Sequence, residues 1–127
     1  MARFLWICLG GAAGTGARYL LTVWTAAALG TRFPYGTLAV NLIGSFLIGV
    51  IMQVGLTTEV LSPTTRMALT TGIMGGFTTY STFSYETVRY LQQGAWGLGA
   101  LNILVTTAGC LIACVLGLAA GRWALSP

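Results

Sequence analysis

The sequence predicts an all-α membrane protein with four transmembrane helices, the third of them broken, and three observations support this fold class. The 127-residue chain is 56% hydrophobic and only 6% charged, whereas about a quarter of the residues of a soluble domain are charged. A membrane-spanning helix needs about 20 mainly apolar residues, so the chain accommodates about four of them with short connections. A segment rich in glycine and hydroxyl groups, residues 72–86, interrupts the third apolar stretch. We therefore expect residues 1–127 to form a single four-helix transmembrane domain in the lipid bilayer.

The first expected span covers residues 4–29, and its apolar character continues past Arg18, which favours an uncleaved helix over a signal peptide. The second span covers residues 35–56. Connections at 30–34 and 57–63 contain proline and polar turn-forming residues on either side of it. The third and fourth spans cover residues 65–91 and 96–125, separated by a short polar stretch that contains Gly94.

Arginines are distributed almost evenly over the two sides of the predicted bundle. With four spans, Arg3, Arg66 and Arg122 lie on one side, and Arg32 and Arg89 on the other. Orientation follows the excess of lysine and arginine in cytoplasmic connections, and this excess is nearly absent. We therefore expect a dual-topology, antiparallel homodimer, an intermolecular counterpart of the inverted repeats of transporters. A poorly encoded single topology is the alternative.

Several functional classes are excluded by composition. The scattered arginines form no basic patch, which argues against a nucleic-acid partner. The absence of histidine, with Glu59 and Glu86 as the only acidic residues, argues against a transition-metal site built from side chains. The three cysteines, Cys8, Cys110 and Cys114, are expected to be free and buried. With no nucleophile–base pair or metal-ligand set, we expect that the chain is not an enzyme.

Polar residues in the second and fourth spans recur every four residues, which places each set on one helix face. An asparagine in hydrocarbon must find hydrogen-bond partners. The two sets therefore either hold helices together or line a narrow polar path, and we favour the path. The first set comprises Thr37, Asn41 and Ser45, and the second comprises Asn102, Thr106, Cys110 and Cys114.

Two charges fall within the predicted spans. Arg18 lies near the middle of the first span, where it must face protein or water. It either is a structural charge satisfied by backbone carbonyls or attracts anions, since the first two spans contain no acidic residue. Glu86 lies in the third span, and an ion pair with Arg89, three residues later, is its structural explanation.

The third span contains the segment GIMGGFTTYSTFSYE, in which Gly75 and Gly76 precede a run of hydroxyl residues. Such a composition predicts a helix break, which the membrane tolerates only where it is buried in protein or lines a cavity. Phe77, Tyr80 and Phe83 recur every third residue, so we expect the three rings on roughly one side of a helix. Taken alone, this spacing is more typical of packing, but the positive ring edges suit a small anion.

The motifs PYGTLAVNLIGSFLIG and GGFTTYSTFSYE, in a chain with four short spans, resemble those of the Fluc (CrcB) fluoride channels. The resemblance covers nearly the whole chain. It implies a multi-pass protein of the cell inner membrane that exports fluoride passively from the cytoplasm. It also implies an antiparallel homodimer with two fluoride pores and a structural sodium ion on the two-fold axis.

The resemblance further implies residue roles. Main-chain carbonyls of Gly75 and Thr78 would bind the sodium ion. Tyr80 and Phe83 occupy the positions of the family's paired pore phenylalanines, and Arg18 resembles an arginine near the aqueous vestibule. The other implied pore-lining residues are Asn41, Thr79, Ser81, Thr82, Glu86, Asn102 and Thr106.

One residue departs from the family pattern, because Tyr80 stands where the motif usually has phenylalanine. Its hydroxyl either donates a hydrogen bond that holds the passing anion longer or narrows the path. The alternative function is a small four-span, proton-coupled multidrug exporter. Such an exporter needs a carboxylate in the first span, where this chain has Arg18 instead. A non-transporting assembly subunit would need no aligned polar residues.

Overall fold

The computed structural model describes residues 1–126, and within this range the chain is helical with no β-strand. Four helical segments follow the expected spans closely at their ends. Three of them are continuous helices: α1 (Ala2–Leu29), α2 (Tyr35–Thr57) and α6 (Trp96–Ala124). The third segment comprises four pieces, namely α3 (Pro63–Met67), the π-helical η1 (Ala68–Met74), α4 (Gly75–Phe77) and α5 (Tyr80–Gln92).

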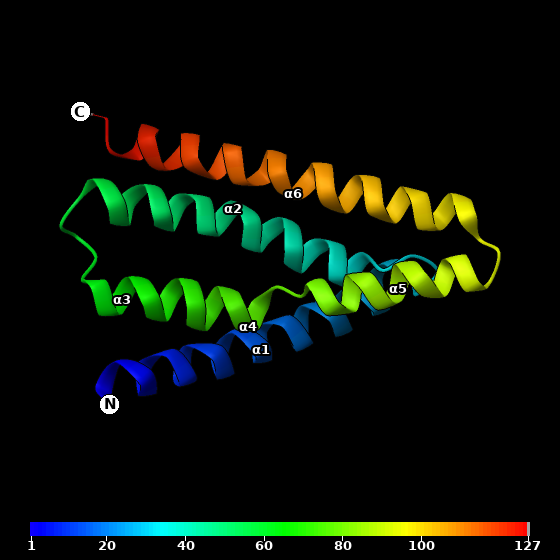
Figure 1. Cartoon of the computed structure of the whole chain (residues 1–127), viewed down its shortest axis with the longest axis horizontal. Coiled ribbons are helices and arrows are strands. Elements are labelled where there is room, and N and C mark those ends of the chain that lie inside the picture. Colours follow the sequence, from blue (N-terminus) through cyan, green and yellow to red (C-terminus); the bar gives the residue numbers. More distant parts are fainter. Residues whose placement is uncertain (127) are drawn as a thin grey trace.

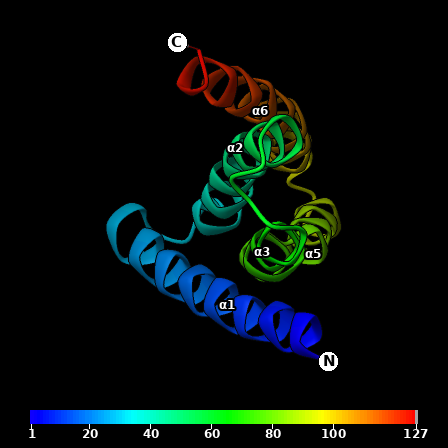
Figure 2. The same cartoon turned by 90° about the vertical axis from the view of Figure 1, so that its left-hand side faces the viewer.

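α2, the third segment and α6 run along the long axis of the molecule, and α1 crosses them at a slant (Figure 1). Both termini and the α2–α3 connection lie at one end, and the α1–α2 and α5–α6 connections lie at the other. Seen along that axis, α6 packs on α2 and α5 but not on α1, which packs on the third segment (Figure 2). The bundle is therefore asymmetric, with α1 and α6 at its two sides.

The distribution of side chains is inverted relative to a soluble protein. Buried positions include many polar side chains, whereas large apolar residues such as Trp6, Trp24 and Leu104 are exposed. Lipid is a suitable solvent for such a surface. Among the described residues, α2 and α6 are the helices long and apolar enough to cross a membrane. The buried polar residues are Thr25, Thr37, Asn41, Thr79, Thr87, Asn102 and Thr106.

Glycines allow close approach of the helix backbones in two places. On α1, a Cβ atom at Gly10 would lie 2.7 Å from the carbonyl oxygen of Ala68, and one at Gly14 would overlap that of Ile73. Between α2 and α6, a Cβ atom at Gly49 would lie 2.5 Å from the carbonyl oxygen of Cys114. Small residues have this role in membrane proteins because lipid supplies no hydrophobic drive between helices. These contacts fix the frame that holds the third segment.

Candidate functional site

The third segment is interrupted at two extended residues, Thr78 (ψ 160°) and Thr79 (φ −153°), between α4 and α5. Asn41 of α2 bonds to both backbone groups of Thr79. The Thr79 N–H donates to Asn41 Oδ1 at 2.8 Å, and Asn41 Nδ2 donates to the Thr79 carbonyl at 3.0 Å. In a continuous helix the Thr79 N–H would donate to the carbonyl of Gly75. Asn41 thus replaces a helical partner and leaves the Gly75 carbonyl without this donor.

Hydroxyl groups around the interruption satisfy nearby backbone groups. The Thr79 side chain caps α5 by accepting from the Thr82 N–H at 3.2 Å, and its hydroxyl donates to Thr82 Oγ1 at 2.9 Å. Thr78 Oγ1 donates to the carbonyl of Met74 at 2.8 Å. Ser81 Oγ lies 3.4 Å from Thr79 Oγ1, and both Ser81 and Thr82 are exposed. The predicted run of hydroxyl residues therefore stabilises the two helix ends that it separates.

Arg18 reaches the interruption from α1. Its Nη1 donates to the carbonyl of Thr78 at 3.5 Å, a long hydrogen bond. This contact agrees with the structural interpretation of Arg18, in which a backbone carbonyl satisfies its charge. The carbonyl that it contacts is one of the two that the family resemblance associates with sodium.

Glu86 of α5 is held by α2. The hydroxyl of Thr37 donates to Glu86 Oε1 at 2.7 Å. The other carboxylate oxygen is buried, and within residues 1–126 it has no hydrogen-bond partner. Arg89, the expected partner of Glu86, lines the same cavity as this carboxylate, but within residues 1–126 the two form no ion pair. The carboxylate therefore faces the polar row of α2.

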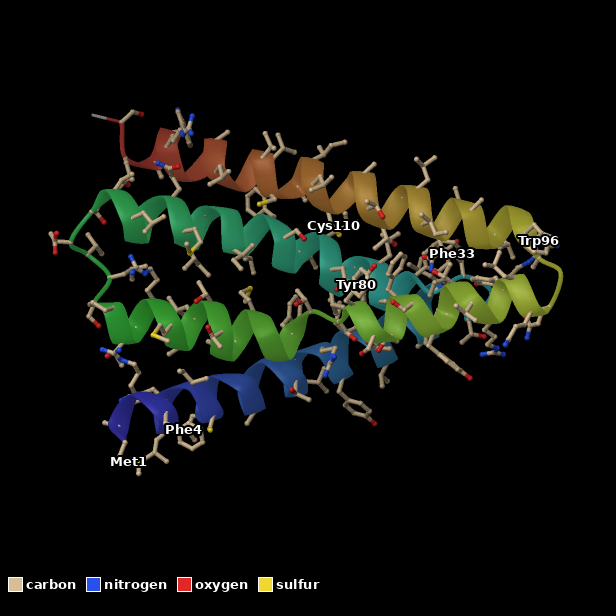
Figure 3. All side chains as sticks on the ribbon, in the orientation of Figure 1. Met1, Phe4, Phe33, Tyr80, Trp96 and Cys110 are labelled. Atoms are coloured by element: carbon tan, nitrogen blue, oxygen red, sulfur yellow. The ribbon has the colours of Figure 1, made fainter. Side chains whose placement is uncertain are left out.

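The three aromatic residues do not share one helix face, contrary to the prediction. Phe77 ends α4, whereas Tyr80 and Phe83 lie on α5 beyond the extended residues, so a helical period does not connect them. Phe77 and Phe83 are buried, whereas Tyr80 is 79% exposed. The ring centroids of Tyr80 and Phe83 lie 5.5 Å apart in a tilted pair. Figure 3 shows Tyr80 beside the interruption, near the middle of the bundle's length.

The polar row of α6 makes a separate hydrogen-bond chain. Asn102 is only 1% exposed, and its Nδ2 donates to Thr87 Oγ1 at 2.9 Å. Thr87 Oγ1 in turn donates to the carbonyl of Phe83 at 2.8 Å, and Thr106 Oγ1 donates to Asn102 Oδ1 at 3.4 Å. Asn102 therefore holds α5 against α6, while Thr106 lines the cavity beside the interruption.

Two cavities lie along the row Thr37, Asn41 and Ser45 of α2. The first, of about 480 Å³, lies at the interruption and is lined by Asn41, Ser45 and residues of the third segment and α6. The second, of about 310 Å³, lies toward the α1–α2 connection and includes Thr37 and Glu86. One polar helix face therefore borders both cavities. Sequence reasoning missed the further lining residues of the second cavity, Thr22, Thr25, Arg32, Arg89 and Tyr90, because no local pattern places the connection beside α5.

A metal ion at this site would depend on backbone oxygens. Within residues 1–126, no group of three or more histidine, cysteine, aspartate or glutamate side chains could hold one. A backbone carbonyl at the interruption is available instead. The Thr79 N–H donates to Asn41, so the Gly75 carbonyl lacks its helical donor. Gly75 is also exposed and lines the cavity of about 480 Å³. Carbonyl oxygens are suitable ligands for hard cations.

The chain is similar to known proteins over nearly its whole length. Residues 5–118 match the model of the family described as CrcB-like protein, Camphor Resistance (CrcB). A fluoride-specific ion channel FluC from Sorangium cellulosum (strain So ce56) is 56% identical over 122 residues, covering 96% of each chain. Proteins of the same name from Anaeromyxobacter sp. (strain K) and Geobacter sulfurreducens are 49% and 48% identical, each over at least 96% of both chains. These relatives are ion channels by name, not enzymes. The chain belongs to the CrcB-like protein family.

Proposed function

We propose that the protein is a fluoride-selective channel of the cell inner membrane, through which fluoride leaves the cytoplasm passively. The relatives named as fluoride channels support the transported ion. The observation that carries the proposal is the polar face of α2, where Thr37 lines one cavity and Asn41 and Ser45 line the other, beside the interruption of the third segment.

Fluoride is small and strongly hydrated, so a selective path must replace its water with hydrogen-bond donors. Along the proposed path these donors are the second N–H of the Asn41 amide and the hydroxyl of Ser45, because the Thr37 hydroxyl already donates to Glu86. Tyr80 and Phe83 would add positive ring edges, which attract an anion without a fixed charge to trap it. Arg18, near the other side of the interruption, would favour anions over cations.

The proposed functional unit is an antiparallel homodimer with two pores. The cavity at the interruption is lined by polar residues and by apolar ones such as Met74 and Leu111, and Tyr80 at its border is 79% exposed. One chain alone therefore encloses the proposed path incompletely. A second copy in the opposite orientation would close the side at Tyr80, and the nearly even distribution of arginines over the two ends permits both orientations.

A structural sodium ion at the dimer centre belongs to the same proposal. The ligand chemistry fits at Gly75, whose carbonyl has lost its helical donor, whereas the Thr78 carbonyl would have to exchange its long hydrogen bond from Arg18 for the ion. Each chain would contribute these two carbonyls, and the ion would link the two copies through main-chain oxygens without a charged side chain as ligand.

A proton-coupled multidrug exporter has less support. Such a transporter needs a carboxylate within the first span to exchange protons for cationic drugs. α1 contains Arg18 there, and its guanidinium donates to the carbonyl of Thr78. The relatives' names also describe ion channels rather than exporters.

The decisive test is fluoride efflux from liposomes that contain the purified protein, followed with a fluoride electrode, with chloride loss as the selectivity control. We expect rapid fluoride loss that chloride does not match. Phe83→Ile should reduce it strongly, because Phe83 borders the cavity at the interruption. Leu104→Ile, an exposed position on the outer surface of α6, is the matched control and should conduct like the wild type.

The outcomes separate the elements of the proposal. Equal loss of fluoride and chloride would exclude fluoride selectivity. Fluoride flux that is unaffected by Phe83→Ile would place the path elsewhere. Coupled drug and proton movement without fluoride loss would favour the exporter instead.

A further inference from the structure

The arginines of the protein differ in whether they have a partner. The chain contains six arginines and no lysine. Within residues 1–126, four of the six donate a hydrogen bond to another residue, and the guanidinium groups of Arg32 and Arg89 do not. The four bonds are Arg3 to Thr64, Arg18 to the Thr78 carbonyl, Arg66 to the Gly55 carbonyl, and Arg122 to Gln53.

The two arginines without a partner line one cavity. Both Arg32, from the α1–α2 connection, and Arg89, from the last turns of α5, border the cavity of about 310 Å³ and are exposed. Their neighbourhood is fixed by a long-range bond, since the hydroxyl of Tyr90 donates to the backbone carbonyl of Arg32 at 2.8 Å. The connection is thereby held beside the helix that carries Arg89, at the end of the bundle where Figure 3 shows Phe33 and Trp96.

The same cavity contains the end of the polar row of α2. Thr37 lines it, and its hydroxyl donates to Glu86 Oε1 at 2.7 Å. The carboxylate contributes one negative charge and the two arginines contribute two positive charges, so the formal balance of these three residues is positive. Without the two arginines, Glu86 would be the only charged residue lining this cavity, and its carboxylate would repel an anion that approaches Thr37.

We infer that Arg32 and Arg89 form a cationic mouth that attracts small anions toward Thr37 and offsets the repulsion by Glu86. This inference rests on the proposed fluoride path. It gives two residues outside the family motifs, Arg32 and Arg89, a role where the ion enters or leaves at this end of the bundle. Exposed charges of one sign around a cavity raise the local concentration of counter-ions and the rate of encounter. The attraction acts through charge, with no fixed hydrogen-bond geometry, which agrees with the exposure of both guanidinium groups.

The test is the dependence of fluoride efflux on ionic strength in liposomes of neutral phosphatidylcholine, with fluoride kept dilute and an impermeant salt added. The Debye length falls from about 30 Å at about 0.01 M salt to about 3 Å at about 1 M. We expect the double variant R32Q/R89Q to lose about tenfold in efflux rate at low salt, the lower end of typical steering effects. At high salt its rate should lie within about twofold of the wild type, because the field is screened.

Two further double variants control for fold and for charge. R32K/R89K keeps both charges and should retain the wild-type rate at low salt. R3Q/R122Q removes the same number of charges at the opposite end of the bundle, where Arg3 and Arg122 bond to Thr64 and Gln53, and should lose much less. Size-exclusion profiles in detergent establish that each variant is folded.

The inference and the proposed function fail in different ways. If the wild type moves no fluoride, the proposed function is wrong. If the wild type conducts but R32Q/R89Q matches it at low salt, or loses the same factor at every salt concentration, the cationic mouth is wrong. A defect that appears only in vesicles containing anionic phosphatidylglycerol would show that the arginines bind lipid headgroups, and this would also overturn the inference.

Discussion

Two contacts of the third segment hold it in the bundle by opposite chemistry. Against α1, its first half packs through glycines, and a side chain at Gly14 would overlap the carbonyl oxygen of Ile73. Against α2, its interruption is held by hydrogen bonds, since Asn41 satisfies both the N–H and the carbonyl of Thr79. The first contact leaves no space for a side chain. The second gives hydrogen-bond partners to backbone groups that have none within the helix.

Together the two contacts keep a non-helical segment of the chain in place. Backbone groups that leave the helical hydrogen-bond ladder need partners, because hydrocarbon supplies none. Close packing against α1 positions the first half of the third segment. The backbone of Thr79, 38 residues from Asn41 in the sequence, is thereby held within reach of the Asn41 side chain. The packed contact supports the fold, whereas the polar contact borders the cavity of the proposed path.

The largest expected effect is at the packed contact. Gly14→Ala should destabilise the protein by about 3 kcal/mol or more, because overpacking here pushes against backbone atoms that cannot rotate away. The measurement is unfolding by SDS titration in mixed micelles, followed by circular dichroism.

Gly16→Ala is the matched control, two residues further along α1. A Cβ atom there meets nothing within 4 Å, and alanine favours helix over glycine by about 0.5–1 kcal/mol. If both substitutions behave alike, the close approach of α1 to the third segment is wrong.

The second effect is at the polar contact. Asn41→Ala leaves the buried Thr79 backbone groups unsatisfied, which should cost about 1–3 kcal/mol. Because Asn41 also lines the cavity at the interruption, fluoride efflux should fall more than the loss of folded protein explains.

Efflux is therefore expressed per folded protein. The control is Gln53→Ala, which removes an amide on the same helix that accepts an exposed, 3.4 Å bond from Arg122. It should alter neither stability nor flux. A normal efflux rate in Asn41→Ala would show that the hydrogen bonds of Asn41 at the interruption are not needed for fluoride conduction.

A smaller effect is expected in the second polar network. Thr87→Val removes the acceptor of Asn102, and a hydrogen bond between membrane helices contributes about 0.6 kcal/mol on average and at most about 1.7. Thr87 lines neither of the two cavities along α2. Stability measured by SDS titration should fall by this small amount, with fluoride efflux unchanged. A large loss of flux would extend the functional surface into the contact between α5 and α6.

The smallest effect on stability is expected at Tyr80. Its ring is 79% exposed and pairs with Phe83, and within residues 1–126 its hydroxyl makes no hydrogen bond. Tyr80→Phe should therefore change the unfolding free energy by less than about 0.5 kcal/mol. If the hydroxyl holds passing fluoride by a bond worth about 0.5–1.5 kcal/mol, its removal should raise efflux about two- to tenfold. An unchanged or lower rate would exclude this role.

Local pattern predicted the helical segments well, including the connections at 30–34 and 57–63, because apolar runs and turn-forming residues act over a few neighbours. The row Thr37, Asn41 and Ser45 was also predictable from its spacing. The shared face of Phe77, Tyr80 and Phe83 was not, because that spacing assumes a continuous helix and two extended residues intervene.

The sequence by itself determined a helical, lipid-facing chain with a polar row on α2 and a glycine-marked third segment, since these properties follow from composition and period. Only the tertiary structure decided that Asn41 bonds to Thr79 and that Arg32 and Arg89 border one cavity. The physical reason is that such contacts join residues 38 or more positions apart. Their existence depends on how the helices pack, and the glycine contacts of α1, α2 and α6 set that packing.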